Sequence, residues 1–497
     1  MQLDGQKFSP QSIRVWHTFL LLNGIFGFAY GLYLSYAYIY LSKQLERLNL
    51  QSVGSSAPVY NVFDNILLVL ALSMFFEAWA EPATGDYADV RGRRRATVVA
   101  FLGMAVAFIL YWLSSVTASI PPDMNPRGLV TTIIAVSAEL SASLALAFFS
   151  GALEAWFVDE LHVTGVSAKA DLQPCFSVKT QVMGGAMVAG GTLSLLLGKT
   201  ALATPQPDLT IGSIASLPWP LAAGLMSLAA LFALVSMVET ETHGVINRPA
   251  FQPTRIFYRI AELGQRREMM LILLVSSLLY ACQVSFAQVL GVVLTDQYLA
   301  QRAENSIVNW LQAHYWVYWL VLGSSRMIGP YLSNVRRGRL SPNRAVTFGY
   351  WGKLNCLFIA LGAIGVLLGV LTPMRIGIFL AWPLFVVAKI FEEAFKPVRE
   401  TYLNELILDR TNRAFTLSMS IPFGSLLVAL VIISLLTTRA LVPGIYDQIA
   451  VSSIGISWLL LIEGLVGVCA VVLAIRRIED PLLSTEAEGT LEGVKYD

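Results

Sequence analysis

The segment 375–406 is apolar over much of its length, yet charged side chains interrupt it repeatedly. Three pairs of opposite charge stand four residues apart, the spacing at which side chains of one helix form ion pairs. These pairs are Lys389–Glu393, Glu392–Lys396 and Lys396–Glu400. A charge at the centre of a bilayer costs at least about 2.5–3.5 kcal/mol, so such residues border water or protein and mark a pathway for a solute or a proton. The pattern predicts a helix beside a wet cavity, with a binding site in the middle of this ladder; a self-neutralising ladder without a binding role is the alternative.

A second polar stripe lies in the apolar segment 128–158. Its members are separated by close to whole helical turns, so they share one face of a helix; they are Glu139, Ser143, Ser150 and Glu154. We expect this face to border the same cavity. In the next apolar segment, Lys179 would need a carboxylate partner, and counting along antiparallel helices places Glu154 and Glu77 at a similar depth.

Further polar groups stand alone in apolar segments. For any one of them, hydrogen bonding between helices is as good an explanation as substrate binding. The full set of candidate residues for a substrate or proton pathway is Asn23, Glu77, Glu139, Glu154, Lys179, Gln283, Lys353, Lys389, Glu392, Glu393 and Lys396.

The composition makes these polar groups exceptional. The chain has 497 residues, of which 56% are hydrophobic and only 13% charged, with a mean hydropathy of +0.63. Soluble domains average about 25% charged residues, so a water-soluble enzyme is excluded. The net charge of +1 argues against a nucleic-acid binder. The cysteines lack metal-ligand spacing, and no G-x-x-x-x-G-K-[ST] loop is present, so we expect no metal, no cofactor and no use of ATP.

A membrane about 30 Å thick is crossed by about 20 apolar helical residues, and twelve runs of the chain are long enough. They are 15–41, 60–84, 95–119, 128–158, 173–198, 216–238, 269–295, 308–333, 344–371, 375–406, 413–437 and 449–475. Lys and Arg are about three times as frequent in the connections on one side as in those on the other, and basic connections stay in the cytoplasm. Both termini are therefore predicted to be cytoplasmic.

The longest connection on that side divides the spans into six and six. We expect an N-terminal bundle over 1–238, a linker over 239–268, a C-terminal bundle over 269–476 and a disordered cytoplasmic tail over 477–497. Around Arg255–Arg259 the linker has an amphipathic helical pattern suited to the inner membrane surface. A plain linker helix is favoured over a regulatory site.

Between the second and third spans the chain reads GDYADVRGRRR, from Gly85 to Arg95. An acid ends one helix, a glycine permits a very short connection, and a basic cluster follows. This stretch resembles the G-x-x-x-D-x-x-G-R-[RK] signature of the major facilitator superfamily, in the place where that family carries it. The fourth and tenth spans end alike, in WFVDEL from Trp156 and TYLNEL from Thr401. A second copy of the loop begins at Gly329 but matches the signature less well, with Asn334 in place of the acid. Any inner gate should therefore carry unequal charge in the two halves.

The resemblance implies an all-α membrane protein with twelve transmembrane helices in two pseudo-symmetric six-helix bundles. In this family the loop acid faces the start of the eleventh helix, and the loop arginine pairs with an acid that ends the fourth. Carried over by position, the gating residues are Gly85, Asp89, Gly92, Arg93, Asp159 or Glu160, and Arg413. The alternative is that the arginines only fix the topology.

The fifth span, with Gly184, Gly185, Gly190 and Gly191, resembles the glycine signature of the family's antiporters but has Ala186 and Met187 at its Gly-Pro position. Close helix packing is still expected. The whole pattern predicts a monomeric, proton-coupled secondary transporter that exports or exchanges a small solute across a bacterial cytoplasmic membrane. Uptake of an anion, through Lys179, Lys353, Lys389 and Lys396, is an alternative, and a membrane receptor or sensor that does not transport is another.

Overall fold

The computed structural model describes residues 2–3, 6–52, 62–117, 129–166, 171–202, 217–239, 252–295, 316–340, 344–371, 376–407, 413–419, 422–441 and 468–478. Each of the twelve segments predicted to span the membrane contains helix within these residues, which confirms the all-α fold class. The only strands of the described part are a short antiparallel pair, β1 (Gln2–Leu3) and β2 (Gln6–Lys7).

The helices of the first half are α1 (Pro10–Ser52), α2 (Val62–Arg91), α3 (Arg93–Thr117), α4 (Leu129–Phe149), α5 (Ala152–Val163), α6 (Gln173–Leu202) and α7 (Pro218–Ser236). A short helix, α8 (Pro253–Gln265), follows. The second half has α9 (Arg267–Thr295), α12 (Trp316–Leu340), α13 (Arg344–Leu371), α14 (Ile376–Leu406), α15 (Arg413–Ser418), α16 (Pro422–Leu441) and a helix over 468–478.

Two spans that the sequence predicts as continuous helices are broken. The fourth divides into α4 and α5 at Gly151, whose φ of 78° lies in the left-handed region that glycine adopts without strain. In the eleventh, α15 ends at Ser418 and α16 begins at Pro422, a residue type that is common at the first position of a helix. Both breaks give short helices whose ends reach the contact between the two halves.

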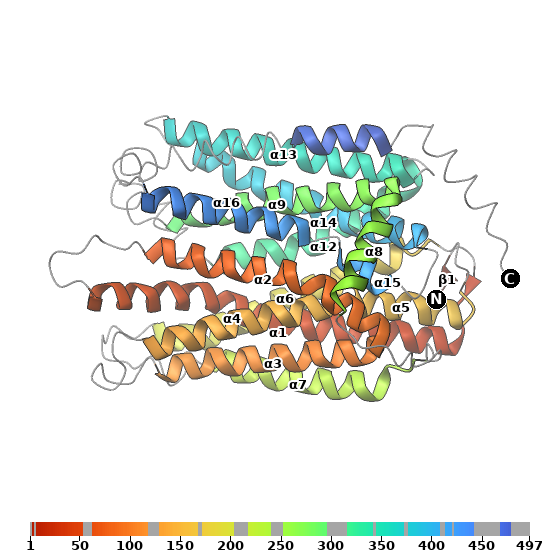
Figure 1. Cartoon of the computed structure of the whole chain (residues 1–497), viewed down its shortest axis with the longest axis horizontal. Helices are drawn as coiled ribbons and strands as arrows, with labels where there is room; N and C mark the ends of the chain where they lie inside the picture. Colours follow the sequence, from red (N-terminus) through yellow and green to blue (C-terminus); the bar gives the residue numbers. More distant parts are fainter. Residues whose placement is uncertain are drawn as a thin grey trace.

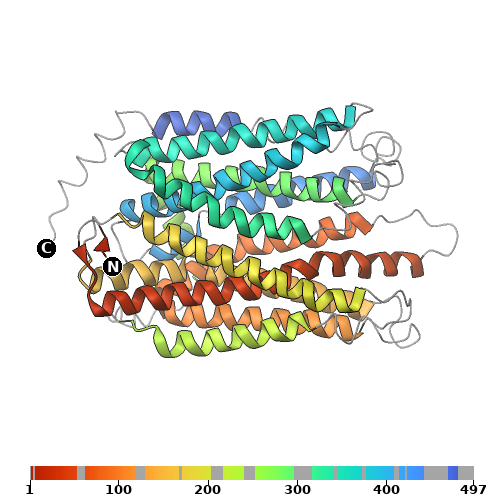
Figure 2. The same cartoon turned by 180° about the vertical axis from the view of Figure 1, so that it is seen from behind.

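The long helices run side by side and form two groups, α1–α7 and α9 to residue 478, which we call the N-lobe and the C-lobe (Figures 1 and 2). One large cluster of buried apolar residues lies within the N-lobe, and a second lies mainly within the C-lobe. Many large apolar side chains remain exposed on the outside, such as Trp79 at 69% and Val235 at 71%. Five helical segments of the described part are long and apolar enough to cross a membrane, and these exposed side chains suit contact with lipid.

The lobes meet along two pairs of helices. Ala71 and Met74 of α2 pack with Val428 and Ala429 of α16. On the other side, a Cβ atom at Gly184 of α6 would lie 2.7 Å from a backbone oxygen of α12. The expected close packing of the glycine-rich helix is therefore present, and part of it lies between the lobes.

Within the N-lobe, α1 and α6 pack through glycines so closely that a Cβ at Gly190 would overlap the carbonyl oxygen of Phe28. We expect Gly190→Ala to lower the free energy of unfolding by about 1–3 kcal/mol, because a backbone atom cannot move aside as a side chain can. Gly185→Ala is the matched control, since its nearest neighbour is a methionine sulfur at 3.8 Å. Thermal unfolding of both variants in the same detergent measures the difference. Equal melting temperatures would contradict the close approach.

Candidate functional site

Asp89 lies in the last turn of α2, with its side chain completely buried. Its two carboxylate oxygens accept hydrogen bonds from the backbone N–H groups of Ala414 and Phe415, each at 3.1 Å. These amides belong to the first turn of α15, where N–H groups have no partner within the helix. The contact between the loop acid and the start of the eleventh span is thus present. It joins the two lobes at one end of the bundle, which we call the Asp89 end.

The charge of Asp89 is set by opposing effects. Burial raises the pKa of its carboxyl group to about 6, while Arg93, Arg259 and the two backbone donors favour the anion. These donors and cations favour the anionic form of Asp89 against the effect of burial. Its negative charge faces the N-terminus of α15, where the helix dipole stabilises an anion.

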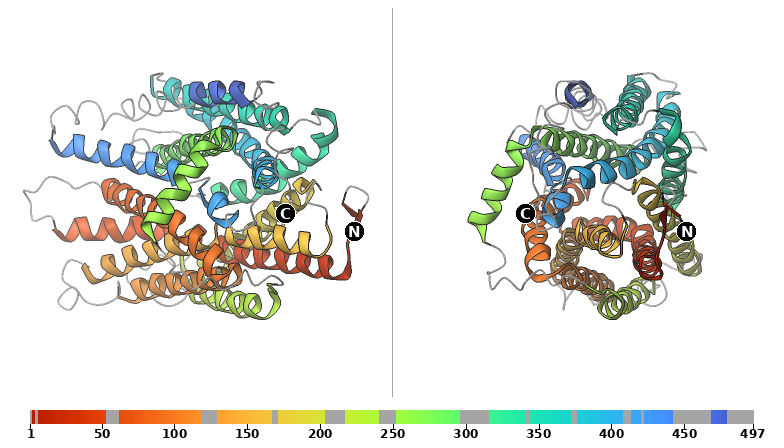
Figure 3. Two further views of the ribbon diagram at one scale, coloured as in Figure 1. Left: turned by 45° about the vertical axis from the view of Figure 1, so that its right-hand side comes forward. Right: turned by 90° about the vertical axis from the view of Figure 1, so that its right-hand side faces the viewer.

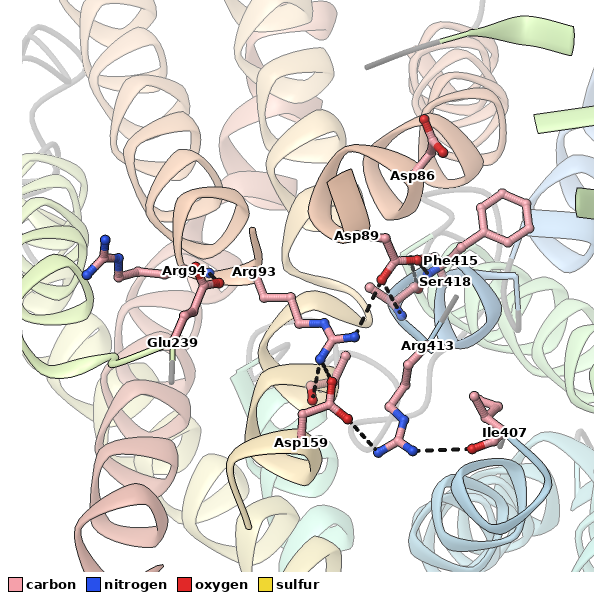
Figure 4. A network of polar contacts seen from close by, with 12 residues as sticks. Asp86, Asp89, Arg93, Arg94, Asp159, Glu239, Ile407, Arg413, Phe415 and Ser418 are labelled. Atoms are coloured by element: carbon pink, nitrogen blue, oxygen red, sulfur yellow. Dashed lines mark hydrogen bonds and ion pairs between the residues drawn. The ribbon is translucent and has the colours of Figure 1, made fainter. Parts of the chain in front are cut away.

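Asp159, at the end of α5, is shared by two buried arginines from different lobes (Figure 4). Arg93, at the start of α3, forms an ion pair with it and also donates to the carbonyl oxygen of Ala155 at 3.2 Å. Arg413, at the start of α15, lies 3.0 Å from the other carboxylate oxygen. All three side chains are at most 10% exposed. Of the two acids that the sequence offers as the partner of Arg93, the ion pair is with Asp159, although Glu160 is also buried.

Glycines allow the lobes to approach here. A Cβ at Gly85 would lie 2.8 Å from the Cα of Phe415, and one at Gly151 would lie 2.8 Å from the carbonyl oxygen of Ala414. Gly92 is the single residue between α2 and α3 and has a φ of 100°. The carboxylate of Glu239 accepts from the N–H of Arg94 at 2.7 Å and so stabilises the start of α3.

The C-lobe has a related arrangement built with different residues. Arg344, at the start of α13, pairs with Glu405 at 3.1 Å within its lobe and with Asp171 of the N-lobe at 2.7 Å. Gln173, at the start of α6, donates to the hydroxyl of Ser333 at 2.9 Å. Ser333 stands four residues after Gly329, as Asp89 stands four after Gly85.

The structure therefore corrects the sequence alignment of the two loops. Ser333, and not Asn334, occupies the position of Asp89, because the helix register places Ser333 against the start of α6. The expected difference in charge between the two halves is present at this position, where a hydroxyl replaces a carboxylate.

Lys179 of α6 forms a second ionic contact between the lobes. It pairs with Glu154 of α5 in its own lobe and with Glu400 of α14 at 3.2 Å in the other. Arg399 lies 3.7 Å from Glu400. Lys179 and Arg399 together therefore balance the carboxylates of Glu154 and Glu400. Glu154 was one of the two partners predicted for Lys179; Glu400 was missed, because a cross-lobe contact leaves no spacing in the sequence.

The N-lobe also contains carboxylates that hydroxyl groups contact. Glu139 of α4 accepts from Tyr33 at 2.9 Å and from Tyr111. Glu81 of α2 is fully buried and accepts from Ser150 at 3.1 Å. The polar stripe of the fourth span thus forms contacts with neighbouring helices of its own lobe, and its place beside a cavity stays a prediction.

The charged ladder of α14 differs in register from the prediction. Lys389 pairs with Glu392, three residues away, and Lys396 lies 2.9 Å from Glu392 and 2.7 Å from Glu393. The predicted pairs Lys389–Glu393 and Lys396–Glu400 are wrong, because Glu393 points toward Arg326 of α12 and Glu400 toward Lys179. Only the pair Glu392–Lys396 is as expected.

The remaining candidates are Asn23, Lys353, Gln283 and Glu77. Asn23 is 2% exposed and donates to the carbonyl oxygen of Phe19 in its own helix, so its place in a substrate pathway is not supported. Lys353 is half-buried in α13. The side chain of Gln283 lies outside the described residues. Glu77 is half-buried in α2, one helical turn before Glu81.

Sequence reasoning did not select several ionic residues of these networks as site residues: Glu81, Asp86, Asp171, Arg255, Arg259, Arg326 and Arg344. Glu400 was part of the predicted ladder, but its contact with Lys179 was not predicted. Glu81 could have been found from its i,i+4 spacing to Glu77. The arginines near the ends of helices were counted only as topology signals.

Solved structures of transporters resemble this arrangement over nearly the full chain. The E. coli fucose:proton symporter FucP, also solved in the outward conformation, has 11% sequence identity and a TM-score of 0.58, covering 94% of this chain and 99% of that one. The proton:xylose symporter XylE of the major facilitator superfamily has 15% identity and a TM-score of 0.58, covering 95% and 97%. The fold is that of the major facilitator superfamily.

The human organic anion transporter MFSD10 has 14% identity and a TM-score of 0.56, covering 93% of this chain and 100% of that one. No protein-family model matches the chain, and no curated protein matches it. At these identities the likeness extends to the fold alone.

Removing the charge of Asp159 leaves two buried arginines without their shared anion. We expect Asp159→Asn to lower the free energy of unfolding of this conformation by about 3–5 kcal/mol, as found when one partner of a buried ion pair is removed. Glu262→Gln, whose carboxylate forms an exposed pair with Arg266, is the control and should have a much smaller effect. Chemical denaturation in detergent measures both; equal effects of the two substitutions would contradict the shared ion pair.

Proposed function

We propose that the chain is a secondary transporter that moves a small solute by alternating access, with its two lobes rocking about a site near the membrane centre. The observation that carries this proposal is the shared carboxylate of Asp159, held between Arg93 of one lobe and Arg413 of the other. Ion pairs between separate rigid units can break and re-form without unfolding either unit. An arrangement of this kind suits a gate.

We place the Asp89 end in the cytoplasm, with both termini there. Basic residues cluster in the connections at this end, among them Arg91, Arg94, Arg95 and Arg336, and such residues are retained on the cytoplasmic side. The ionic contacts between the lobes lie near the same end. The conformation would then be closed to the cytoplasm, and the resemblance to FucP in the outward conformation agrees with this.

Proton coupling is supported by Glu139, Glu81 and Glu77 of the N-lobe. Within the described residues these carboxylates form no ion pair, and Glu139 and Glu81 are held by hydroxyl groups. Buried carboxylates of this kind form proton relays in pumps and transporters. Two of the similar structures are proton symporters, which also fits.

Uptake of an anion is the second candidate function. Arg326, Lys389 and Lys396 gather around Glu392 and Glu393 in the C-lobe, so this group has three cations and two anions. A negatively charged solute would balance the excess. The likeness to an organic anion transporter is consistent with it.

A sensor that does not transport would show no flux under any gradient.

Opening of the gate can be measured without knowing the substrate. Spin labels at Arg95→Cys of the N-lobe and Arg336→Cys of the C-lobe, both exposed positions, report the distance between the lobes in a Cys469→Ser background. We expect Asp89→Asn to shift the distance distribution toward longer values, because it weakens the contact with the start of α15. A single distance, unchanged by Asp89→Asn, would argue against rocking.

Proton movement gives a second test. Proteoliposomes that contain a pH-sensitive dye are screened against sugars, nucleosides and organic anions, with and without an imposed pH gradient. We expect one class of solute to change the internal pH, and Glu139→Gln to reduce this signal at least about tenfold. Glu262→Gln, whose carboxylate forms an exposed pair with Arg266, is the matched control and should leave it unchanged. Full activity of Glu139→Gln would exclude Glu139 from the relay.

A further inference from the structure

The short helix α8 lies across the outside of the bundle, beside the last turns of α2, with its axis roughly perpendicular to the long helices (Figures 1 and 3). Ile256, Ile260 and Leu263 on one side of α8 pack on an apolar cluster that belongs mainly to the C-lobe and includes a few residues of α2 to α5. Because α8 ends at Gln265 and α9 begins at Arg267, the linker helix is continuous with the C-lobe. The amphipathic helix expected in the linker is present. It does more than connect the halves, because its polar side chains contact both of them.

Two arginines of α8 reach from the C-lobe to buried acids of the N-lobe. Arg255 donates from Nε to Asp86 at 2.8 Å and also binds it through its Nη2 atom. Arg259 lies 3.2 Å from Asp86 and 3.5 Å from Asp89, and its guanidinium group stacks over Phe415 at 5.3 Å from the ring centroid. Asp86 is completely buried, so separation of the lobes would break a charge-assisted, bidentate contact.

The opposite side of α8 is exposed and partly apolar. Phe257 and Tyr258 are each 72% exposed, although aromatic residues usually lie inside a protein or at an interface. Ala261 is exposed on the same side, and Arg266 and Arg267 follow exposed at the end of the helix. Aromatic residues with flanking basic residues, on a helix parallel to the membrane, are typical of an interfacial helix.

We propose that this face of α8 docks on the inner leaflet of the membrane and that anionic phospholipid thereby holds the gate closed. Phe257 and Tyr258 enter the interface between headgroups and acyl chains, and Arg266 and Arg267 bind anionic headgroups. Docking fixes α8 in the orientation in which Arg255 and Arg259 reach Asp86 and Asp89. The inference rests on the proposed cytoplasmic location of the Asp89 end, and it adds a lipid surface as a regulatory partner.

The partner is a lipid surface because of where the face lies. The helix lies on the outside of the bundle at the level where α2 ends (Figures 1 and 3), and the bundle carries many exposed large apolar side chains. Its basic residues stand at one end of the helix, which suits negatively charged headgroups. Lipid binding can bias the gate only if it favours one conformation over the other; the contact with Asp86 supplies that difference, because it exists only while the lobes are together.

Lipid contact is tested first, with an environment-sensitive dye at Ala261→Cys, a position that preserves both aromatic residues. In nanodiscs of phosphatidylcholine and phosphatidylglycerol we expect blue-shifted emission and quenching by brominated lipid. The same dye at Arg336→Cys, exposed on α12, is the control and should report water. Water-like emission at Ala261→Cys overturns the proposal. Emission that shifts with protein concentration and not with brominated lipid identifies a second copy as the partner, and also overturns it.

Control of the gate is tested with Ser418→Cys, which is buried at the lobe contact, where its hydroxyl donates to the carbonyl oxygen of Ser150 at 3.1 Å. Its rate of reaction with a soluble thiol reagent reports opening in the Cys469→Ser background. We expect phosphatidylglycerol to slow labelling about fivefold or more relative to phosphatidylcholine. Phe257→Ser with Tyr258→Ser should abolish this lipid effect, and Thr254→Ser with Gln265→Ser, on the same exposed side, should preserve it.

The regulatory role is overturned if Ser418→Cys is labelled at the same rate in both lipids while the dye at Ala261→Cys still reports contact with lipid. Asp89→Asn separates this result from failure of the proposed function: if it also fails to speed labelling, the rocking gate itself is wrong. If Asp89→Asn speeds labelling while lipid has no effect, the gate stands and the lipid role falls.

Discussion

The structure depends on the requirement that a buried charge has a partner. Asp159 meets this requirement for two arginines at once, and because Arg93 and Arg413 belong to different lobes, one carboxylate ties the halves together. Breaking a buried pair leaves an uncompensated charge unless water enters. The contact is therefore stable only while the lobes are closed at this end, and opening must coincide with hydration. This coupling between lobe separation and water entry is what the proposed gate requires.

The two lobes use corresponding positions with unequal chemistry. At the start of α15 a carboxylate receives the backbone amides, whereas at the start of α6 the hydroxyl of Ser333 receives a side-chain amide. Arg344 and Asp171 restore an ionic contact on this second side. The lobe contact thus has a stronger and a weaker half.

Charge is also divided between the lobes along the middle of the spans. The N-lobe presents carboxylates held by tyrosine and serine hydroxyls, and the C-lobe presents the cations of α12 and α14 around two glutamates. In the proposed function, a proton would bind in the first lobe and a negatively charged group of a solute in the second. This division agrees with a transporter that couples a solute to protons, and the lipid-facing helix α8 would add control from outside the pathway.

The sequence by itself determined the helical segments, the short turn at Gly92, and Asp89 and Arg93 as residues that contact the start of α15 and Asp159. It could do so because apolar length, glycine and charge in short connections are local signals. It did not determine the breaks at Gly151 and before Pro422, the register of the second loop, or the partners of Glu393 and Glu400. Those depend on which helix faces which, and side-chain direction across a contact is decided by packing. Asp86 and Arg255 stand 169 residues apart in the sequence and are joined by a hydrogen bond in the fold. Their contact could not be predicted, because no spacing within a single helix records a contact between lobes.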